Sequence, residues 1–111
     1  MDVNYIIIIF TAISFISYGI NSFISKKMIA EFVRWGLEKR RKYIGAFQLI
    51  CGLGLLVGLK YELILIASSL ILIGMMLVAM YVRIKIKDNI SRILPAITYF
   101  VLNVLILNYS L

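Results

Sequence analysis

The sequence predicts an all-α fold, a four-transmembrane-helix bundle in an up-down-up-down arrangement, and three observations support this prediction. Hydrophobic residues make up 63% of the 111 positions, and the mean hydropathy is +1.03. Four nearly charge-free apolar runs follow one another along the chain. Eleven of the 12 Lys and Arg residues gather in two connectors between these runs. Because a soluble domain of this length needs more charges on its surface, we expect a single integral membrane domain over residues 1–111.

The four apolar runs predict membrane spans at residues 3–24, 43–59, 63–82 and 93–111. A helix rises about 1.5 Å per residue and the hydrocarbon core of a bilayer is about 30 Å thick, so a span needs about 20 apolar residues. The second run is the shortest of the four. The connectors are short, which favours antiparallel neighbours in a left-handed bundle.

The positions of the basic residues predict how the chain is threaded through the cell membrane. Connector 25–42 carries seven Lys or Arg residues and connector 83–92 carries four, whereas the turn between the second and third spans carries only Lys60. Loops rich in Lys and Arg stay on the cytoplasmic side of a membrane. We therefore expect both basic connectors in the cytoplasm and both termini outside. The net charge of +7 then reflects topology, and we expect no nucleic-acid partner.

The first connector contains the pattern of a short amphipathic helix lying in the membrane interface. Its apolar residues have helical spacing: Met28, Ile29, Phe32, Val33 and Leu37. Trp35 is expected at the depth of the lipid headgroups. A basic cluster follows: Lys39, Arg40, Arg41 and Lys42. This surface would bind anionic lipid or an acidic partner, and the simpler alternative is a topology signal with an interfacial anchor.

Polar side chains inside the spans are the candidate ligand-binding residues. The first span has a polar stripe whose members are three, four or seven residues apart: Asn4, Thr11, Ser14, Tyr18, Asn21 or Ser22, and Ser25. Gln48 in the second span and Tyr99 and Asn103 in the fourth would join Tyr18 around the polar head of a ligand. The alternative is that these groups only form hydrogen bonds between helices.

Glycines in the second span predict close helix packing. Gly54 and Gly58 form one face, and Gly45 and Gly52 form another, turned by roughly a third of the helical circumference. Two such faces suit a helix packed between neighbours. They also predict a membrane protein partner or a homo-oligomer docked on small residues.

The residue types that the chain lacks exclude several function classes. Cys51 is the only cysteine and there is no histidine, so we expect no disulfide within the chain and no metal site. The four predicted spans contain no Asp, Glu, Lys or Arg, whereas carriers that couple to protons or ions usually need one. Without such a group, a Ser or Cys nucleophile also lacks an activating base, and we expect no catalytic residue.

Several segments spread along the chain have a familiar arrangement. They are Gly19, Glu31-Phe32-Val33-Arg34-Trp35-Gly36-Leu37, Ile44-Gly45-Ala46-Phe47-Gln48-Leu49, Gly52-Leu53-Gly54-Leu55-Leu56, the polar connector from Arg83, and Pro95-Ala96 opening the fourth span. In these segments the sequence resembles the DoxX-like family of small four-helix membrane proteins. Many relatives carry a Glu in place of Gln48 and a His near Arg83, so this chain departs from the groups that would support proton or redox chemistry.

The resemblance implies a small integral membrane accessory protein. Some members look like subunits of quinone-linked oxidoreductases, others accompany redox or stress functions, and some animal relatives are chaperones for receptor assembly. Our first hypothesis is a non-catalytic accessory or assembly protein that docks partners through its small-residue faces and basic cytoplasmic surface. The second is a quinone- or lipid-binding subunit of a membrane redox complex. We expect no cofactor under the first hypothesis, and quinone is the one candidate cofactor under the second. A small transporter ranks last, because no coupling residue is present.

Overall fold

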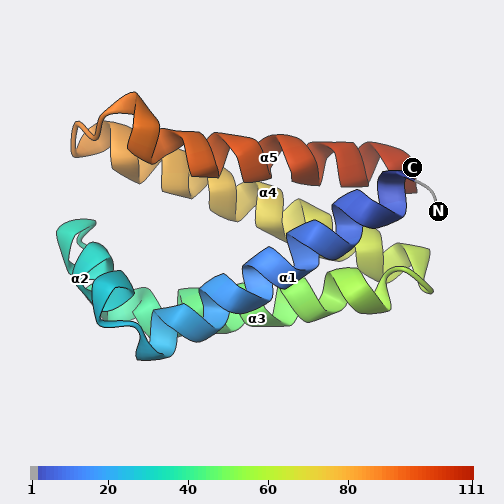
Figure 1. The fold of residues 1–111 in the computed structure, drawn as a ribbon, viewed down its shortest axis with the longest axis horizontal. Coiled ribbons are helices and arrows are strands. Elements are labelled where there is room, and N and C mark those ends of the chain that lie inside the picture. The colour runs from blue at the N-terminus through green and yellow to red at the C-terminus, as the bar shows by residue number, and fades with distance from the viewer. Residues whose placement is uncertain (1–2) are drawn as a thin grey trace.

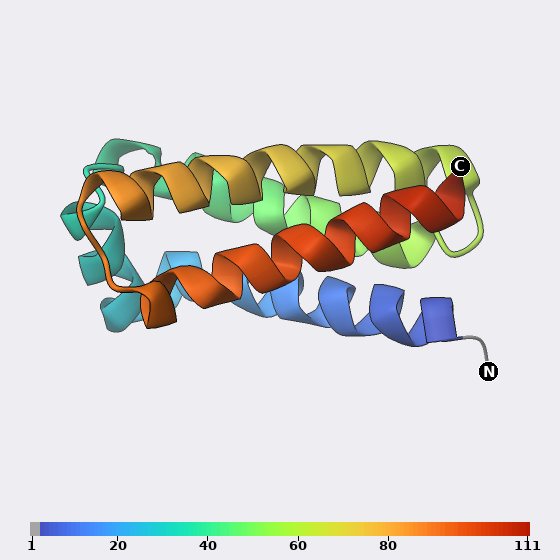
Figure 2. The ribbon, with the colours of Figure 1, turned by 90° about the horizontal axis from the view of Figure 1, so that it is seen from above.

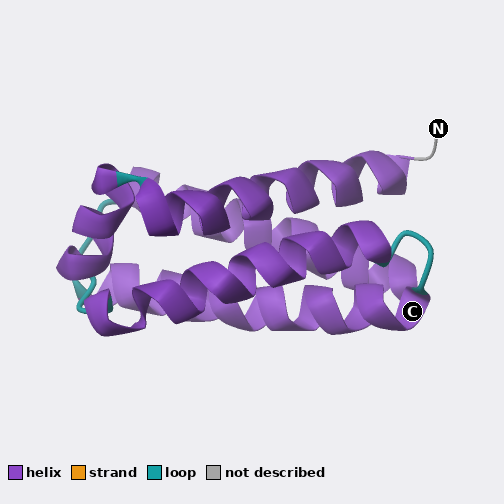
Figure 3. Cartoon of the chain, turned by 90° about the horizontal axis from the view of Figure 1, so that it is seen from below, coloured by secondary structure: helices purple, strands orange, loops and turns teal. Residues whose placement is uncertain are grey.

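The computed structural model describes residues 3–111, which form helices joined by loops and turns, with no strand (Figure 3). The elements are α1 (Val3–Ile24), α2 (Lys26–Arg34), the 3-10 helix η1 (Glu38–Arg40), α3 (Arg41–Val57), α4 (Glu62–Lys85) and α5 (Ile90–Ser110). The all-α prediction is therefore confirmed. Within the described residues, α1, α4 and α5 are long and apolar enough to cross a membrane, while α3 has 17 residues.

The long helices form two pairs, α1 with α3 and α4 with α5 (Figure 1). In Figure 1 the pairs lie close together where α1 starts and α5 ends, and they diverge toward the opposite end. Helix α2 lies across that opposite end (Figures 1 and 2). All four long helices contribute to the apolar core: Ile8, Phe15, Leu55, Leu72 and Ile106 are each at most 2% exposed. The two pairs thus form a wedge that is widest at the α2 end of the bundle.

Glycines bring α3 into close contact with α1. A Cβ atom on Gly19 would lie 2.8 Å from the carbonyl oxygen of Gly45, and one on Gly52 would lie 3.0 Å from the carbonyl oxygen of Ala12. Only glycine permits backbones to approach this closely. The contacts also show that α1 and α3 run antiparallel, because the later residue of each helix meets the earlier residue of the other.

The second glycine face of α3 packs against α4. A Cβ on Gly54 would overlap Ser68 Oγ, and one on Gly58 would lie 2.7 Å from the Cα of Leu65. Both glycine faces are thus covered by helices of the same chain. The structure does not leave them free as the surfaces on which partner proteins were expected to dock.

Helices α3, α4 and α5 differ in their boundaries from the predicted spans. Helix α3 ends at Val57 rather than at residue 59, because the chain turns at Gly58 and Leu59. Helix α4 continues to Lys85, so Arg83 belongs to a helix and not to a connector. Helix α5 begins at Ile90, where Asn89 Oδ1 accepts a hydrogen bond of 3.2 Å from the Arg92 amide.

Pro95 was expected in the first turn of the last helix, and it lies in the second turn of α5 instead. The early start at Ile90 is the reason, since the Asn89 cap adds residues before the proline. Proline has no amide hydrogen, so the carbonyl of Ser91 lacks its usual partner four residues later.

Two turns of the same type, one after α2 and one after α4, determine how the chain leaves these helices at the α2 end of the molecule. Gly36 lies two residues after the end of α2, and its φ of +75° allows the Leu37 amide to reach the carbonyl of Phe32 at 2.9 Å. Lys87 lies two residues after the end of α4 at φ +62°, and the Asp88 amide reaches the carbonyl of Arg83 at 2.9 Å. A non-glycine residue in this conformation costs about 1 kcal/mol. The second turn holds Asp88 where its carboxylate meets α2.

Candidate functional site

A pocket of about 940 Å³ lies between the two helix pairs at the α2 end of the molecule. Residues from all five α-helices line it. Pockets for small ligands usually have volumes of about 300 to 1,000 Å³. The space is therefore large enough for a substantial part of a lipid-sized molecule.

The inner wall of the pocket is aromatic and sulfur-rich. Phe15, Tyr18, Met75, Met76 and Tyr99 all contribute to it. The Phe15 and Tyr18 rings meet the Tyr99 ring edge to face, with centroids 5.4 and 5.7 Å apart. Tyr99 also donates a hydrogen bond of 3.0 Å to Ser14 Oγ on α1. These contacts join α1 to α5 and fix one wall, while the methionines of α4 supply an adaptable surface.

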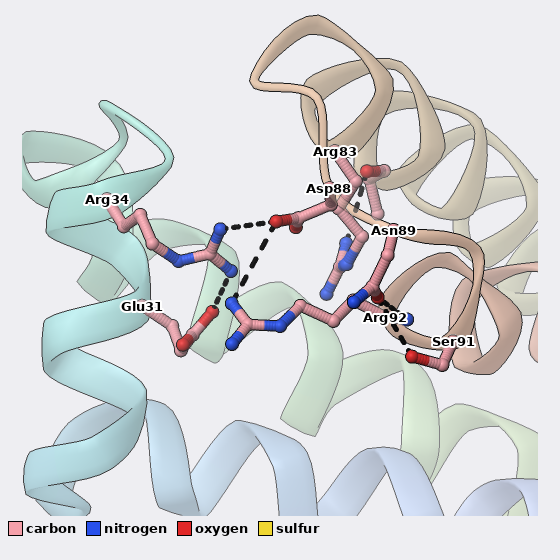
Figure 4. A network of polar contacts seen from close by, with 8 residues as sticks. Glu31, Arg34, Arg83, Asp88, Asn89, Ser91 and Arg92 are labelled. Atoms are coloured by element: carbon pink, nitrogen blue, oxygen red, sulfur yellow. Dashed lines mark hydrogen bonds and ion pairs between the residues drawn. The ribbon is translucent and has the colours of Figure 1, made fainter.

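The mouth of the pocket is basic. Five positively charged side chains line the pocket: Lys27, Arg34, Arg40, Arg83 and Arg92. Glu31 is the acidic residue in the lining, and the carboxylate of Asp88 lies next to it in the ionic network of Figure 4. Positive charge is thus in excess where α2 faces the α4–α5 turn.

Arg34 links α2 to the α4–α5 turn. Its Nη1 donates to Asp88 Oδ1 at 2.6 Å, its Nη2 donates to Glu31 Oε2, and Arg92 Nη1 lies 3.9 Å from the same Asp88 oxygen (Figure 4). The hydrogen bond from Arg34 holds the pKa of the Asp88 carboxyl below its usual range. Hydrogen bonds to Asp88 and Glu31 likewise raise the pKa of Arg34. Both groups therefore stay charged at neutral pH, and the ion pair closes one side of the mouth.

Arg83 extends from the last turns of α4 toward α2. Its guanidinium carbon lies 4.4 Å from the centroid of the Trp35 ring, a cation–π contact. Its Nη1 donates to the carbonyl of Ala79 at 3.1 Å. The indole Nε1 of Trp35 is buried and has no hydrogen-bond partner within residues 3–111. A half-buried cation and an unsatisfied donor therefore lie side by side in the pocket lining.

The family of the chain follows from its sequence. A family model described as the DoxX-like family matches residues 6–106. The chain belongs to the DoxX-like family. The match runs from α1 into the last turns of α5 and includes every residue of the pocket lining. Searches of curated proteins and of solved structures returned no match. Family membership and the three apolar helices together indicate a small multi-pass membrane protein.

In this family member, three of the four predicted ligand-binding residues line the pocket: Tyr18, Gln48 and Tyr99. Gln48 Oε1 lies 3.4 Å from Ser22 Oγ, so the amide also connects α3 to α1. Asn103 is not in the lining. It is fully buried one turn beyond Tyr99, and its Nδ2 donates to the Tyr99 carbonyl at 2.8 Å. Asn103 thus lies in the core near the closed part of the wedge.

The residues predicted to form a lipid or partner surface divide into three groups. Trp35 and Arg40 line the pocket, so Trp35 is more than an outer anchor. Arg41 donates to the carbonyls of Ser22 and Phe23 and thereby caps the end of α1. Lys39 and Lys42 are exposed.

Sequence reasoning missed the pocket residues of the α4–α5 corner, Arg83 and Arg92, and their neighbour Asp88. The predicted third span stops before the first charged residue, Arg83. Apolar residues nevertheless continue at Ile84 and Ile86, and no Gly or Pro lies between them. That continuity was the available signal for a longer helix. The ion pair between Arg34 and Asp88 joins residues 54 positions apart, which no local pattern announces. Within residues 3–111 no three His, Cys, Asp or Glu side chains gather as a metal site would require.

Proposed function

We propose that this DoxX-like protein spans the cell membrane four times and acts as a non-catalytic accessory protein that holds an amphipathic ligand, a lipid or a quinone. The main support for this proposal is that the lining of the pocket at the α2 end has two parts. Its inner wall is aromatic and methionine-rich, and its mouth is basic. An amphiphile matches both parts, because its apolar body suits the wall and its polar head suits the mouth.

The fourth span in this proposal is α3. The helix packs antiparallel to α1 along its length, and it exposes Ile50, Leu53 and Val57 at 64%, 49% and 47%. Such a surface belongs in hydrocarbon when its neighbour spans the membrane. Seventeen residues reach about 26 Å, and local thinning of the bilayer accommodates a shortfall of a few ångströms. Helix α2 would then lie at the cytoplasmic interface.

This topology predicts which positions an impermeant thiol reagent reaches in intact cells. On a Cys51→Ala background, Lys60→Cys should react from outside, because the α3–α4 turn is external in the proposal. Lys39→Cys should react only after the membrane is permeabilised, since its connector is cytoplasmic. Both side chains are exposed, so accessibility within the protein does not limit either reaction. The reverse pattern, or equal labelling of both, would show that the proposed topology is wrong.

An accessory role is supported by the state of Asp88 beside the mouth. The hydrogen bond from Arg34 holds the pKa of the Asp88 carboxyl below its usual range, so this carboxylate exchanges protons poorly near neutral pH. The exposed Lys39 and Lys42 leave a basic cytoplasmic surface for anionic lipid or an acidic partner protein.

Gly74→Phe tests the ligand-binding proposal. Gly74 lines the pocket, and a Cβ added there meets nothing within 4 Å, so the new ring enters the pocket without straining the backbone. We expect native mass spectrometry in mild detergent to find an amphiphile retained by the natural protein and a several-fold lower occupancy in Gly74→Phe.

The matched control is Leu77→Phe, which adds a ring at an exposed position of α4 outside the pocket. It should retain the ligand of the natural protein. Equal occupancy in all three proteins, or no retained amphiphile in the natural protein, would contradict the proposed function.

A further inference from the structure

The charges around the pocket mouth do not balance. Five basic side chains line the pocket, while the carboxylates available to them are those of Glu31 and Asp88. Both carboxylates are engaged by Arg34, and Arg92 approaches the Asp88 oxygen as well. The nearby acidic groups are thus already used, and the remaining positive charge faces the pocket.

These ion pairs leave out three of the five basic groups, and Arg83 is the half-buried one, whereas Lys27 and Arg40 are exposed. Within residues 3–111, the salt bridges join Glu31 and Asp88 to Arg34 and Arg92. Among the described residues, the Arg83 guanidinium, which has five N–H donors, donates to the Ala79 carbonyl. The face of the Trp35 ring supplies a further contact, but a ring does not neutralise a charge. A half-buried guanidinium in this position has a strong tendency to take an anion.

The indole of Trp35 adds a second unsatisfied donor. Its buried Nε1 has no partner within the described residues, and its ring lies 4.4 Å from the Arg83 guanidinium carbon. Buried polar groups in proteins are almost always hydrogen-bonded. An acceptor bound to Arg83 would satisfy this donor as well if the side chains that cover the indole nitrogen moved aside.

We infer that the pocket binds an anionic amphiphile, with its phosphate or carboxylate head held by Arg83 and Trp35 and its apolar chain along Phe15, Met75 and Met76. This inference rests on the proposed function and names the class of ligand. A guanidinium forms paired hydrogen bonds with phosphate and carboxylate oxygens, whereas the neutral head of a quinone offers no charge to it. The chain of the ligand lies where the aromatic and methionine walls exclude water.

Trp35 provides the readout, because it is the only tryptophan in the chain. The protein is reconstituted in phosphatidylcholine vesicles, and phosphatidylglycerol or phosphatidylcholine with brominated chains is titrated in. Bromine quenches tryptophan fluorescence at short range. We expect quenching by the anionic lipid to be half-complete at a mole fraction about tenfold lower than that needed for the zwitterionic lipid.

Arg83→Gln should reduce this preference to about unity, and Arg83→Lys should leave an intermediate preference because it keeps the charge and loses the paired geometry. Lys60→Gln removes an exposed charge in the α3–α4 turn, outside the pocket and at the opposite end of the bundle, and should change nothing. The variants are compared by how quenching depends on the mole fraction of brominated lipid. The absolute fluorescence of Trp35 is not compared, because Arg83 touches the Trp35 ring and its replacement changes that fluorescence directly.

The outcomes separate this inference from the proposed function. In one outcome, both brominated lipids quench Trp35 at the same mole fraction while Gly74→Phe abolishes saturable quenching. That result would support the proposed ligand-binding pocket and contradict the inference that its ligand is anionic. If no saturable quenching occurs in the natural protein, both fail. Inorganic phosphate tests whether the site binds a free anion or a lipid. The inference requires that millimolar phosphate displaces the brominated anionic lipid only weakly. If phosphate displaces the lipid as well as unbrominated anionic lipid does, the site recognises the phosphate group without the lipid chain.

Discussion

Gly19→Val is expected to prevent α1 from pairing with α3. A Cβ at this position would lie 2.8 Å from both the Gly45 carbonyl oxygen and the Leu49 amide nitrogen. Backbone atoms of a helix cannot move aside as a flexible side chain can, so the two helices must separate. Overpacking of a well-packed core costs about 1–3 kcal/mol, and a clash with backbone lies at or above the top of that range.

Thermal unfolding in mild detergent measures this effect, with Gly74→Ala as the matched control. Both substitutions add carbon to a glycine inside a long helix, but a Cβ at Gly74 meets nothing within 4 Å. Gly74→Ala should therefore keep or slightly raise the melting temperature, since alanine favours helix by about 1 kcal/mol over glycine. Similar melting temperatures for Gly19→Val and the natural protein would show that the α1–α3 contact is not as close as described.

Phe15→Ala is expected to have the second-largest effect, because Phe15 belongs both to the core and to the pocket wall. The side chain is 0% exposed, and its ring meets Tyr18 and Tyr99 edge to face. Removing a buried phenylalanine ring costs about 3–5 kcal/mol, since the surrounding side chains only partly refill the space. The melting temperature in detergent should fall by roughly 10 °C or more.

Ile13→Ala is the control for this variant. Ile13 lies on the same helix and is 56% exposed, on the side that faces lipid in the proposed topology. Its truncation leaves the inner packing intact, so its melting temperature should stay close to that of the natural protein. An equal loss in both variants would mean that the burial of Phe15 does not stabilise the fold, contrary to the structure.

The two variants bear on different parts of the candidate site. Gly19 holds α1 on α3, and this pair forms one side of the wedge (Figure 1). Phe15 belongs to the hydrophobic core and also lines the pocket, so it separates the pocket from the core. The ligand pocket therefore depends on packing that lies outside its basic mouth, and substitutions at Arg83 or Gly74 probe ligand binding more directly than substitutions in the core.

Local patterns account for what could be predicted from the sequence. Apolar runs of about 20 residues predict helices, and the ends of α1 coincide with the predicted span 3–24. The small residues of α3 predict close packing, and Gly52 and Gly54 indeed meet two different helices. The segments spread over the chain predict membership of the DoxX-like family, which the match over residues 6–106 confirms.

The sequence by itself thus determined the helices, the family and the apolar character of a small membrane protein, because each depends on composition and on neighbours a few positions apart. Only the tertiary structure decided what the charged and polar residues do. It placed Arg83 over Trp35, paired Arg34 with Asp88, and separated Asn103 from Tyr18 and Gln48. These relations depend on how the two helix pairs diverge and on the turn at Lys87, and contacts between residues 48 or more positions apart leave no periodic signal in one sequence.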